Sequence, residues 1–191
     1  MKVYEHAQHA LLSVLNDGLS FQIAINQTLK QEKKKIDRDF KGTVSALVGC
    51  SLRHFYIFEK LIKDYFVEVD NNDISLLMIA LSNKLFVKKI DEAEMEEYVE
   101  KECSYEQTKD FLDENSDVRK LIPESVPSDS KTYVQLRYNI PLWIVHMWAK
   151  NNGPVLSKRL YFSFGQNPSR LVHAHAPRGK QPDLPALPCL H

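Results

Sequence analysis

Apolar residues recur at intervals of three and four along the first 120 residues, which is the spacing of one buried face of an α-helix. The pattern predicts an amphipathic helix over residues 3–16, ended by Asp17 and Gly18, and a second over residues 20–33 with Ser20 as its N-cap. Residues 37–65 form the longest periodic stretch and predict one long helix or two nearly continuous helices. Gly42 and Gly49 are the candidate sites of close packing or bending there.

The polar residues 71–73 give a turn and N-cap signal before a strongly apolar helix that reaches Phe86. Residues 91–114 predict one or two acidic helices with few apolar side chains to bury. Residues 122–130 are rich in Pro and Ser and predict a connector. Because no convincing strand alternation precedes the connector, we predict that residues 1–122 form one all-α domain.

A linker over residues 123–135 and a second, partly helical unit over residues 136–172 are expected to follow. Arg137 and Tyr138 are predicted to enter this unit in an extended conformation, and Pro141 favours a helix that begins at or just after it. Trp143 and Trp148 are expected to anchor that helix in a core. Residues 173–191 contain four prolines and no periodicity, which predicts a disordered or vector-derived tail.

The chain has 191 residues and a formal net charge of +0, but its charges are strongly segregated. Basic residues predominate over residues 30–63 and acidic residues over residues 91–117, so one face is expected to attract phosphate and another to repel it. No apolar run approaches the roughly 20 residues of a membrane helix, and the amino end lacks a signal-peptide core. We therefore expect a cytoplasmic protein without a membrane partner.

The basic segment supplies the candidate RNA-binding residues, whose cationic groups can meet several phosphates and release counterions. They are Lys30, Lys33, Lys34, Lys35, Arg38, Lys41 and Arg53. A solvated basic loop without a ligand is the alternative for the lysine run. Arg53 has an alternative of its own, because it can pair internally with Glu59 or Asp64 instead of contacting a phosphate or base.

Catalytic and metal-binding patterns are not evident in the sequence. Cys50, Cys103 and Cys189 have neither the even number of a disulfide framework nor the spacing of a zinc site, and the seven histidines do not combine with acids into a metal-binding pattern. No strand with a glycine-rich turn and helix is predicted, so the chain lacks a cofactor fingerprint. We expect this polypeptide alone to have no catalytic residues, no bound metal and no cofactor.

Three segments nevertheless carry a family signal in their order and spacing. Residues 136–148 resemble the Y-S-x-P-x-W-L-[VI]-x-x-W element that begins the catalytic part of the RsmB (Sun, Fmu) family of ribosomal RNA cytosine-C5 methyltransferases. Residues 37–54 resemble a helix of the NusB-like domain that precedes it, and residues 166–171 resemble a strand entry of the same family. The matching residues of the helix are Asp37, Arg38, Phe40, Val48, Gly49, Leu52 and Arg53.

The resemblance covers nearly the whole chain up to Val172. It implies a NusB-like helical bundle that binds 16S ribosomal RNA, not DNA, followed by the first elements of a methyltransferase whose S-adenosylmethionine-binding domain belongs to a longer parent protein. Two departures stand out: residues 106–115 lack the family's basic helix, and His173 and Ala174 replace the end of the strand entry. The alternatives are a free-standing NusB-like transcription antitermination factor and an all-α protein-interaction module.

Overall fold

The computed structural model describes residues 2–30 and 37–151, and all regular secondary structure within them is helical. The all-α prediction is therefore confirmed. The elements are α1 (Val3–Asp17), α2 (Phe21–Lys30), α3 (Arg38–Arg53), α4 (Phe55–Tyr65), α5 (Asn71–Ser82), the π-helical turn η1 (Asn83–Val87), α6 (Glu92–Glu102), α7 (Thr108–Glu114), the 3-10 turn η2 (Val118–Lys120) and α8 (Lys131–Tyr138). A last helix covers residues 142–151.

Short polar side chains fix where several helices begin, as N-caps do by accepting an otherwise unpaired backbone N–H. The Asp37 carboxylate accepts from the Phe40 N–H at 2.7 Å, and the Asp91 carboxylate accepts from the Glu94 N–H at 3.1 Å. The N-cap of α5 is Asp70. The helix therefore begins slightly earlier than predicted, and residues 71–73, which were predicted to form the turn and cap, belong to its first turn. At the end of α1, Gly18 adopts the left-handed conformation (φ 65°) that a glycine tolerates best.

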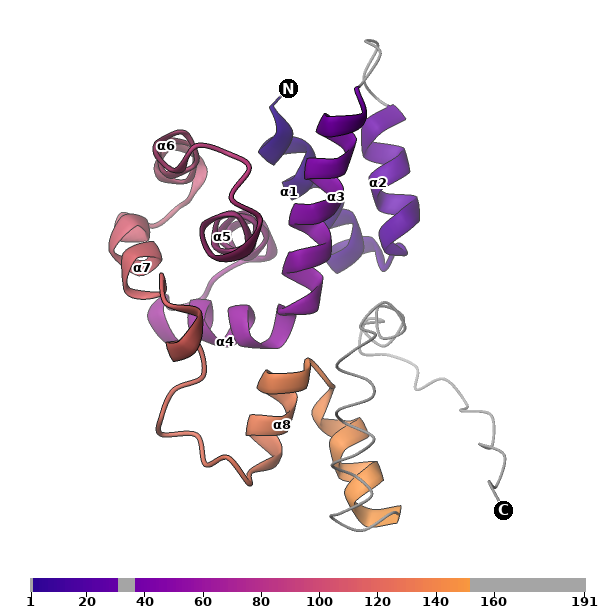
Figure 1. The fold of residues 1–191 in the computed structure, drawn as a ribbon, viewed down its shortest axis with the longest axis vertical. Coiled ribbons are helices and arrows are strands. Elements are labelled where there is room, and N and C mark those ends of the chain that lie inside the picture. The colour runs from indigo at the N-terminus through magenta and orange to yellow at the C-terminus, as the bar shows by residue number, and fades with distance from the viewer. Residues whose placement is uncertain (1, 31–36, 152–191) are drawn as a thin grey trace.

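The long periodic stretch is two helices, and neither predicted glycine bends it. The break lies at His54, where the backbone leaves helical geometry (φ −112°, ψ 21°), and α4 then runs across the end of α3 (Figure 1). A Cβ added at Gly42 would meet nothing within 4 Å, and one added at Gly49 would lie 3.8 Å from the Phe21 ring, an ordinary contact distance. Gly42 therefore lies on the open surface of α3, and Gly49 lies where α3 meets α2. Neither glycine is at a bend.

Helix α5 lies at the centre of the bundle, where Figure 1 views it nearly end-on with α1 to α3 on one side and α6 and α7 on the other. Its side chains from Leu76 to Leu81 are almost completely buried, which explains why this helix is apolar all round. The buried Ser51 hydroxyl of α3 lies 3.2 Å from the Met78 carbonyl oxygen and 2.8 Å from the Ser82 hydroxyl. These bonds satisfy the polar groups where α3 crosses α5.

The chain leaves α5 through a π-helical turn that is held from within by one buried amide. The Asn83 side-chain oxygen accepts from the N–H groups of Lys89 and Ile90, both at 3.1 Å, and its NH₂ group donates to the Ile90 carbonyl at 2.9 Å. Lys88 sits in the left-handed region (φ 51°) between these partners. These bonds tie the end of the turn back to its first residue, and η1 packs against α3.

The segment after the connector folds back onto the bundle through Asn139. Its side-chain oxygen accepts from the Tyr56 N–H at 3.1 Å, and its NH₂ group donates to the Leu52 carbonyl at 2.8 Å. Residues 122–130 contain no helix, as the connector prediction requires, but α8 already begins at Lys131. The predicted extended entry is wrong for Arg137 and Tyr138, which end α8; the chain turns at Asn139 (φ 53°) instead.

The helix predicted to begin at or after Pro141 is confirmed over residues 142–151. Three buried side chains of this helix, Ile144, Val145 and Trp148, form a small second core together with Ile140, which precedes the helix. Trp148 is buried as predicted, whereas the Trp143 side chain is 42% exposed. One of the two indoles therefore anchors the helix and the other faces outward.

Candidate nucleic-acid interface

The outward face of α3 carries basic side chains at both ends and small residues between them. Arg38, Lys41 and Arg53 are exposed, and at about 100° per residue they fall on the same side of the helix as Gly42 and Ser45. Arg38 and Arg53 are separated along the axis by about 22 Å, at 1.5 Å per residue. Gly42 and Ser45 leave the part of this face next to Arg38 and Lys41 low, and nearer to Arg53 the Phe21 ring of α2 lies against Gly49.

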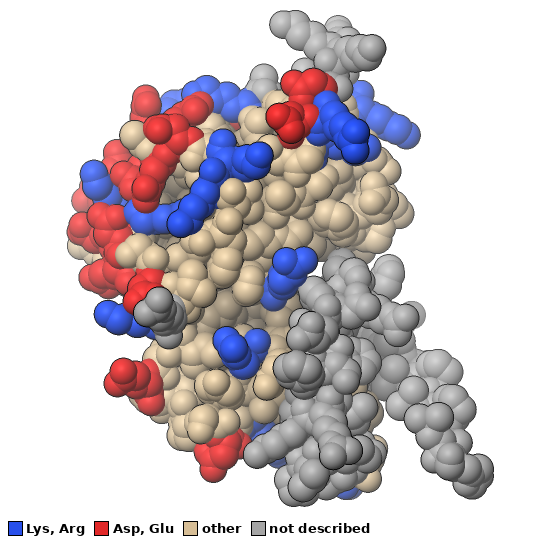
Figure 2. All heavy atoms as spheres, in the orientation of Figure 1, with Lys and Arg blue, Asp and Glu red and all other residues tan. Residues whose placement is uncertain are grey.

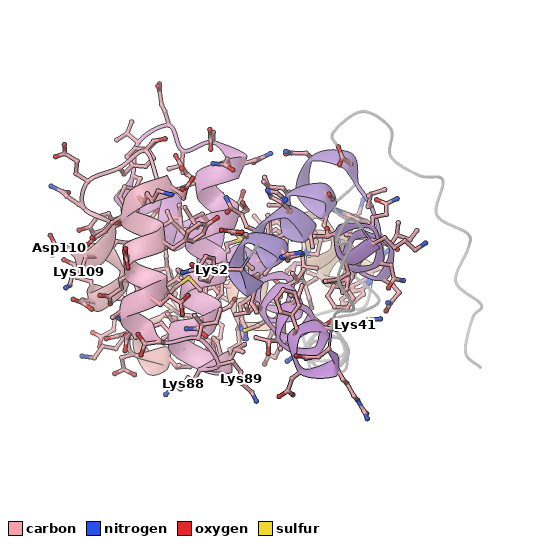
Figure 3. All side chains as sticks on the ribbon, turned by 90° about the horizontal axis from the view of Figure 1, so that it is seen from above. Lys2, Lys41, Lys88, Lys89, Lys109 and Asp110 are labelled. Carbon is pink, nitrogen blue, oxygen red and sulfur yellow. The ribbon has the colours of Figure 1, made fainter. Side chains whose placement is uncertain are left out.

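Two further lysines extend this surface, and sequence reasoning missed them. Lys88 and Lys89 are exposed and directly follow η1, which packs on α3. Figure 3 shows Lys88 and Lys89 along the lower edge of the view and Lys41 further along on the right, while Lys109 and Asp110 project at the far left. In the sequence these residues are visible only as two adjacent lysines after an apolar helix. The periodicity of apolar residues does not show on which surface such a pair lies.

The basic side chains of the described ranges divide into two groups according to their partners. Some are held by carboxylates: Lys2 by Glu94, Lys60 by Asp64, Lys63 by Glu59, Lys84 by Glu92, Glu96 and Asp113, Lys101 by Glu102, and Lys109 by Glu96. Ten others form no ion pair with a carboxylate of the described residues. Five of them lie apart, at the end of α2, after α7, on α8 and in the last helix: Lys30, Lys120, Lys131, Arg137 and Lys150. The other five lie on α3 or directly after η1: Arg38, Lys41, Arg53, Lys88 and Lys89. We call these five residues the basic face.

Arg53 belongs to the second group for a specific reason. Its two predicted internal partners are engaged elsewhere, since Glu59 lies 2.6 Å from the Lys63 ammonium and Asp64 lies 2.7 Å from the Lys60 ammonium. The Arg53 side chain is exposed at the last turn of α3. Of the two roles the sequence left open, internal pairing is therefore absent from the described residues, and the guanidinium remains available for an external anion.

An aromatic pair lies beside Arg53. The rings of His54 and Phe86 are stacked with centroids 4.4 Å apart and planes within 2° of parallel, and the completely buried Phe58 ring lies beneath them, 5.7 Å from His54 and 6.5 Å from Phe86. Burial, with a smaller contribution from the charge of Arg53, lowers the pKa of His54 to about 4. At neutral pH the imidazole is therefore an uncharged aromatic surface.

The depressed pKa of His54 predicts a specific acid sensitivity. The unfolded chain takes up a proton near pH 6.5 and the folded protein only near pH 4, so stability present above pH 6.5 is lost as the pH falls toward 4. We expect this loss to reach up to about 3 kcal/mol and to be absent from His54→Phe, which keeps the ring stack without a titrating group. Urea unfolding at pH 7 and pH 4.5 measures it. Equal losses for both proteins would contradict the assignment.

Opposite charge gathers on another side of the molecule. Figure 2 shows acidic side chains along the side where Figure 1 places α6 and α7, whereas the middle of this view carries basic side chains in a largely uncharged surface. Lys84 is 12% exposed and points into the acidic group, with its ammonium 2.7 Å from Glu92 and 2.8 Å from Asp113. It therefore holds η1, α6 and α7 together and adds no charge to the basic face.

The remaining sequence predictions divide between described and undescribed residues. Lys30 is exposed at the end of α2, while Lys33, Lys34 and Lys35 lie outside the described residues, as do Cys189 and the residues predicted to form a tail. Burial raises the pKa of the Cys50 thiol, and it raises the pKa of Cys103 to about 11. Neither thiol has the lowered pKa of a reactive nucleophile.

No group of three or more His, Cys, Asp and Glu side chains in the described ranges is arranged to hold a metal ion. Among the same residues, every helix is too short or too polar to cross a bilayer. Comparison with models of protein families, with curated proteins and with solved structures finds no match to this chain. The features of the chain that point to a function are therefore the basic face, the aromatic pair beside it and the family resemblance of the sequence.

Proposed function

We propose that this chain is the RNA-binding N-terminal region of an RsmB-like 16S ribosomal RNA cytosine-C5 methyltransferase. In this proposal the helical body formed by residues 2–122 is NusB-like and holds RNA phosphates on the basic face. The observation that carries the proposal is the grouping of the cations: those of the basic face are exposed and unpaired with carboxylates of the described residues, while the lysines of α4, α6 and α7 are all paired. Unpaired, clustered cations are what a polyanion can neutralise with release of counterions.

The docking of residues 131–148 supports the methyltransferase reading over a free-standing factor. Asn139 lies in the segment that resembles the start of the family's catalytic part, and it binds the backbone on both sides of Arg53 and His54. The segment that would lead to a catalytic domain is thus fastened next to one end of the basic face. A free-standing RNA-binding factor would have no use for such a joint.

The described residues contain no strand followed by a glycine-rich turn and a helix, so we propose none of them as a ligand of S-adenosylmethionine. The chain's proposed contribution is to bind and orient the RNA, and the chemistry belongs to a domain of the longer parent protein.

Fluorescence anisotropy tests the proposal with a labelled fragment of 16S ribosomal RNA and a DNA duplex of the same length at equal salt. We expect micromolar or tighter binding of the RNA and at least tenfold weaker binding of the DNA. Binding of neither nucleic acid would overturn the proposal and favour the protein-interaction alternative. Equal binding of both would contradict its specificity for RNA.

A further inference from the structure

Phe86, in the π-helical turn η1, is a large aromatic residue that is left partly exposed to solvent. Its side chain is 37% exposed, although the neighbouring Phe58 is completely buried. Leaving an aromatic ring in water forgoes the stabilisation that burial would give. The chain nevertheless presents this ring from a turn whose conformation is less favourable than an α-helix, and π-helical turns are frequently found at functional sites.

The ring is held rigidly from behind. One side of Phe86 is occupied by the parallel ring of His54, which itself rests on the core through Phe58. The backbone that carries it is fixed by the three hydrogen bonds of the Asn83 side chain. An aromatic surface that is already immobilised loses little conformational freedom when a planar group stacks on it.

Cations lie on both sides of this ring along the chain. Arg53 directly precedes His54, and its charge is felt at the imidazole. Lys88 and Lys89 follow Phe86 and are exposed. A single ring bordered by cations is a poor match for an extended apolar protein surface, but it matches a nucleotide, whose base is a flat aromatic group and whose phosphates are anionic.

We propose that the exposed side of Phe86, backed by His54, is the stacking site for one unpaired base of the bound RNA, with Arg53 and the Lys88–Lys89 pair at the flanking phosphates. The inference rests on the proposed RNA-binding function and adds the class of target. The site takes a single-stranded loop or bulge, because the bases of a continuous duplex are stacked on each other and cannot reach the ring.

Substitution of Phe86 tests the stacking site with two probes: an oligouridylate of about ten nucleotides and a blunt RNA duplex. Phe86→Leu keeps apolar volume against His54 but removes the aromatic face, and Phe86→Trp keeps that face. We expect Phe86→Leu to weaken binding of the single strand roughly five- to 150-fold and to leave the duplex within about twofold. Phe86→Trp should bind the single strand within about twofold of the unchanged protein.

Ile23→Ala is the matched control, because Ile23 is a 48% exposed apolar side chain on α2. It should leave both affinities within about twofold. A direct optical readout comes from Phe86→Trp, whose added fluorescence should be quenched by the oligouridylate relative to the unchanged protein with its own Trp143 and Trp148. Quenching that requires the single strand supports stacking on this ring.

The outcomes separate the two proposals. If the unchanged protein binds neither probe nor the ribosomal fragment, the proposed function fails and the stacking site fails with it. If the unchanged protein binds the single strand and Phe86→Leu binds it equally well, RNA binding stands and only the stacking site is overturned. Equal loss for single strand and duplex would also overturn it, since it would indicate a general disturbance of the basic face.

Discussion

Replacing the whole basic face with glutamine is expected to reduce the affinity for single-stranded RNA by roughly three powers of ten at about 0.1 M salt. Each lost phosphate contact removes about 0.7 from the slope of log K against log salt, so five contacts remove about 3.5. The effect should be similar for different RNA sequences, because phosphate contacts carry no base information. Exposed residues of this kind contribute within about 0.5 kcal/mol to stability, so the fold should survive.

Two double variants give the matched comparison for this prediction. Lys88→Gln with Lys89→Gln should lower the salt slope by about 1.4, which is twice 0.7. Lys101→Gln with Lys109→Gln removes the same charge from the acidic side, where Glu102 and Glu96 already hold these lysines. The second pair should leave the slope unchanged. Equal losses from both pairs would show that net charge, and not a defined surface, governs binding.

Asn139→Ala is expected to release the segment after the connector from the helical body. The substitution leaves the Leu52 carbonyl without its donor and the Tyr56 N–H without its acceptor, and each such loss costs about 1–3 kcal/mol at a buried site. Alanine is also strained in the left-handed backbone that Asn139 adopts. We expect the docking of residues 131–148 to weaken by about 2–4 kcal/mol while the bundle stays folded.

Hydrogen exchange measures this prediction directly, because protection should fall in α8 and in residues 142–151 and remain in α5. Asn139→Gly separates the two causes: glycine tolerates the left-handed conformation but makes no side-chain hydrogen bonds, so it should lose nearly as much protection as alanine. Asn115→Ala is the control, since its amide bonds only the Phe111 carbonyl within its own helix. Unchanged protection in Asn139→Ala would show that apolar contacts alone hold the joint.

The helices of the bundle could be predicted because each has a local cause. The apolar spacing of residues 3–16, the stop at Asp17 and Gly18 and the periodic stretch that begins at residue 37 act within a few residues of chain, and α1 and the start of α3 agree with them. The bend at His54 could not be found in this way. It lies where Ser51 meets α5 and where Asn139 meets the α3–α4 junction, and both contacts join residues far apart in the sequence.

Part of the candidate site was predictable from the sequence, and part of it depends on contacts between distant residues. Arg38 and Lys41 were expected together in the basic segment, whereas Arg53 was left between an external contact and internal pairing. In the structure all three lie on one side of α3. Lys84 and Lys88 look equivalent in the sequence, but one points into the acidic group and the other follows the turn onto the basic face. Only the packing of η1 between α3 and the acidic helices distinguishes them. Phe86 was predicted as an ordinary member of an apolar helix for the same reason.

Ultraviolet cross-linking of the bound 16S ribosomal RNA fragment, followed by mass spectrometry of the peptides, shows which surface of the protein holds the RNA. We expect cross-links in residues 38–54 and 83–90, with Phe86 among the modified residues, and none in α6 or α7. Cross-links concentrated in α6 and α7, with the basic face unmodified, would contradict it.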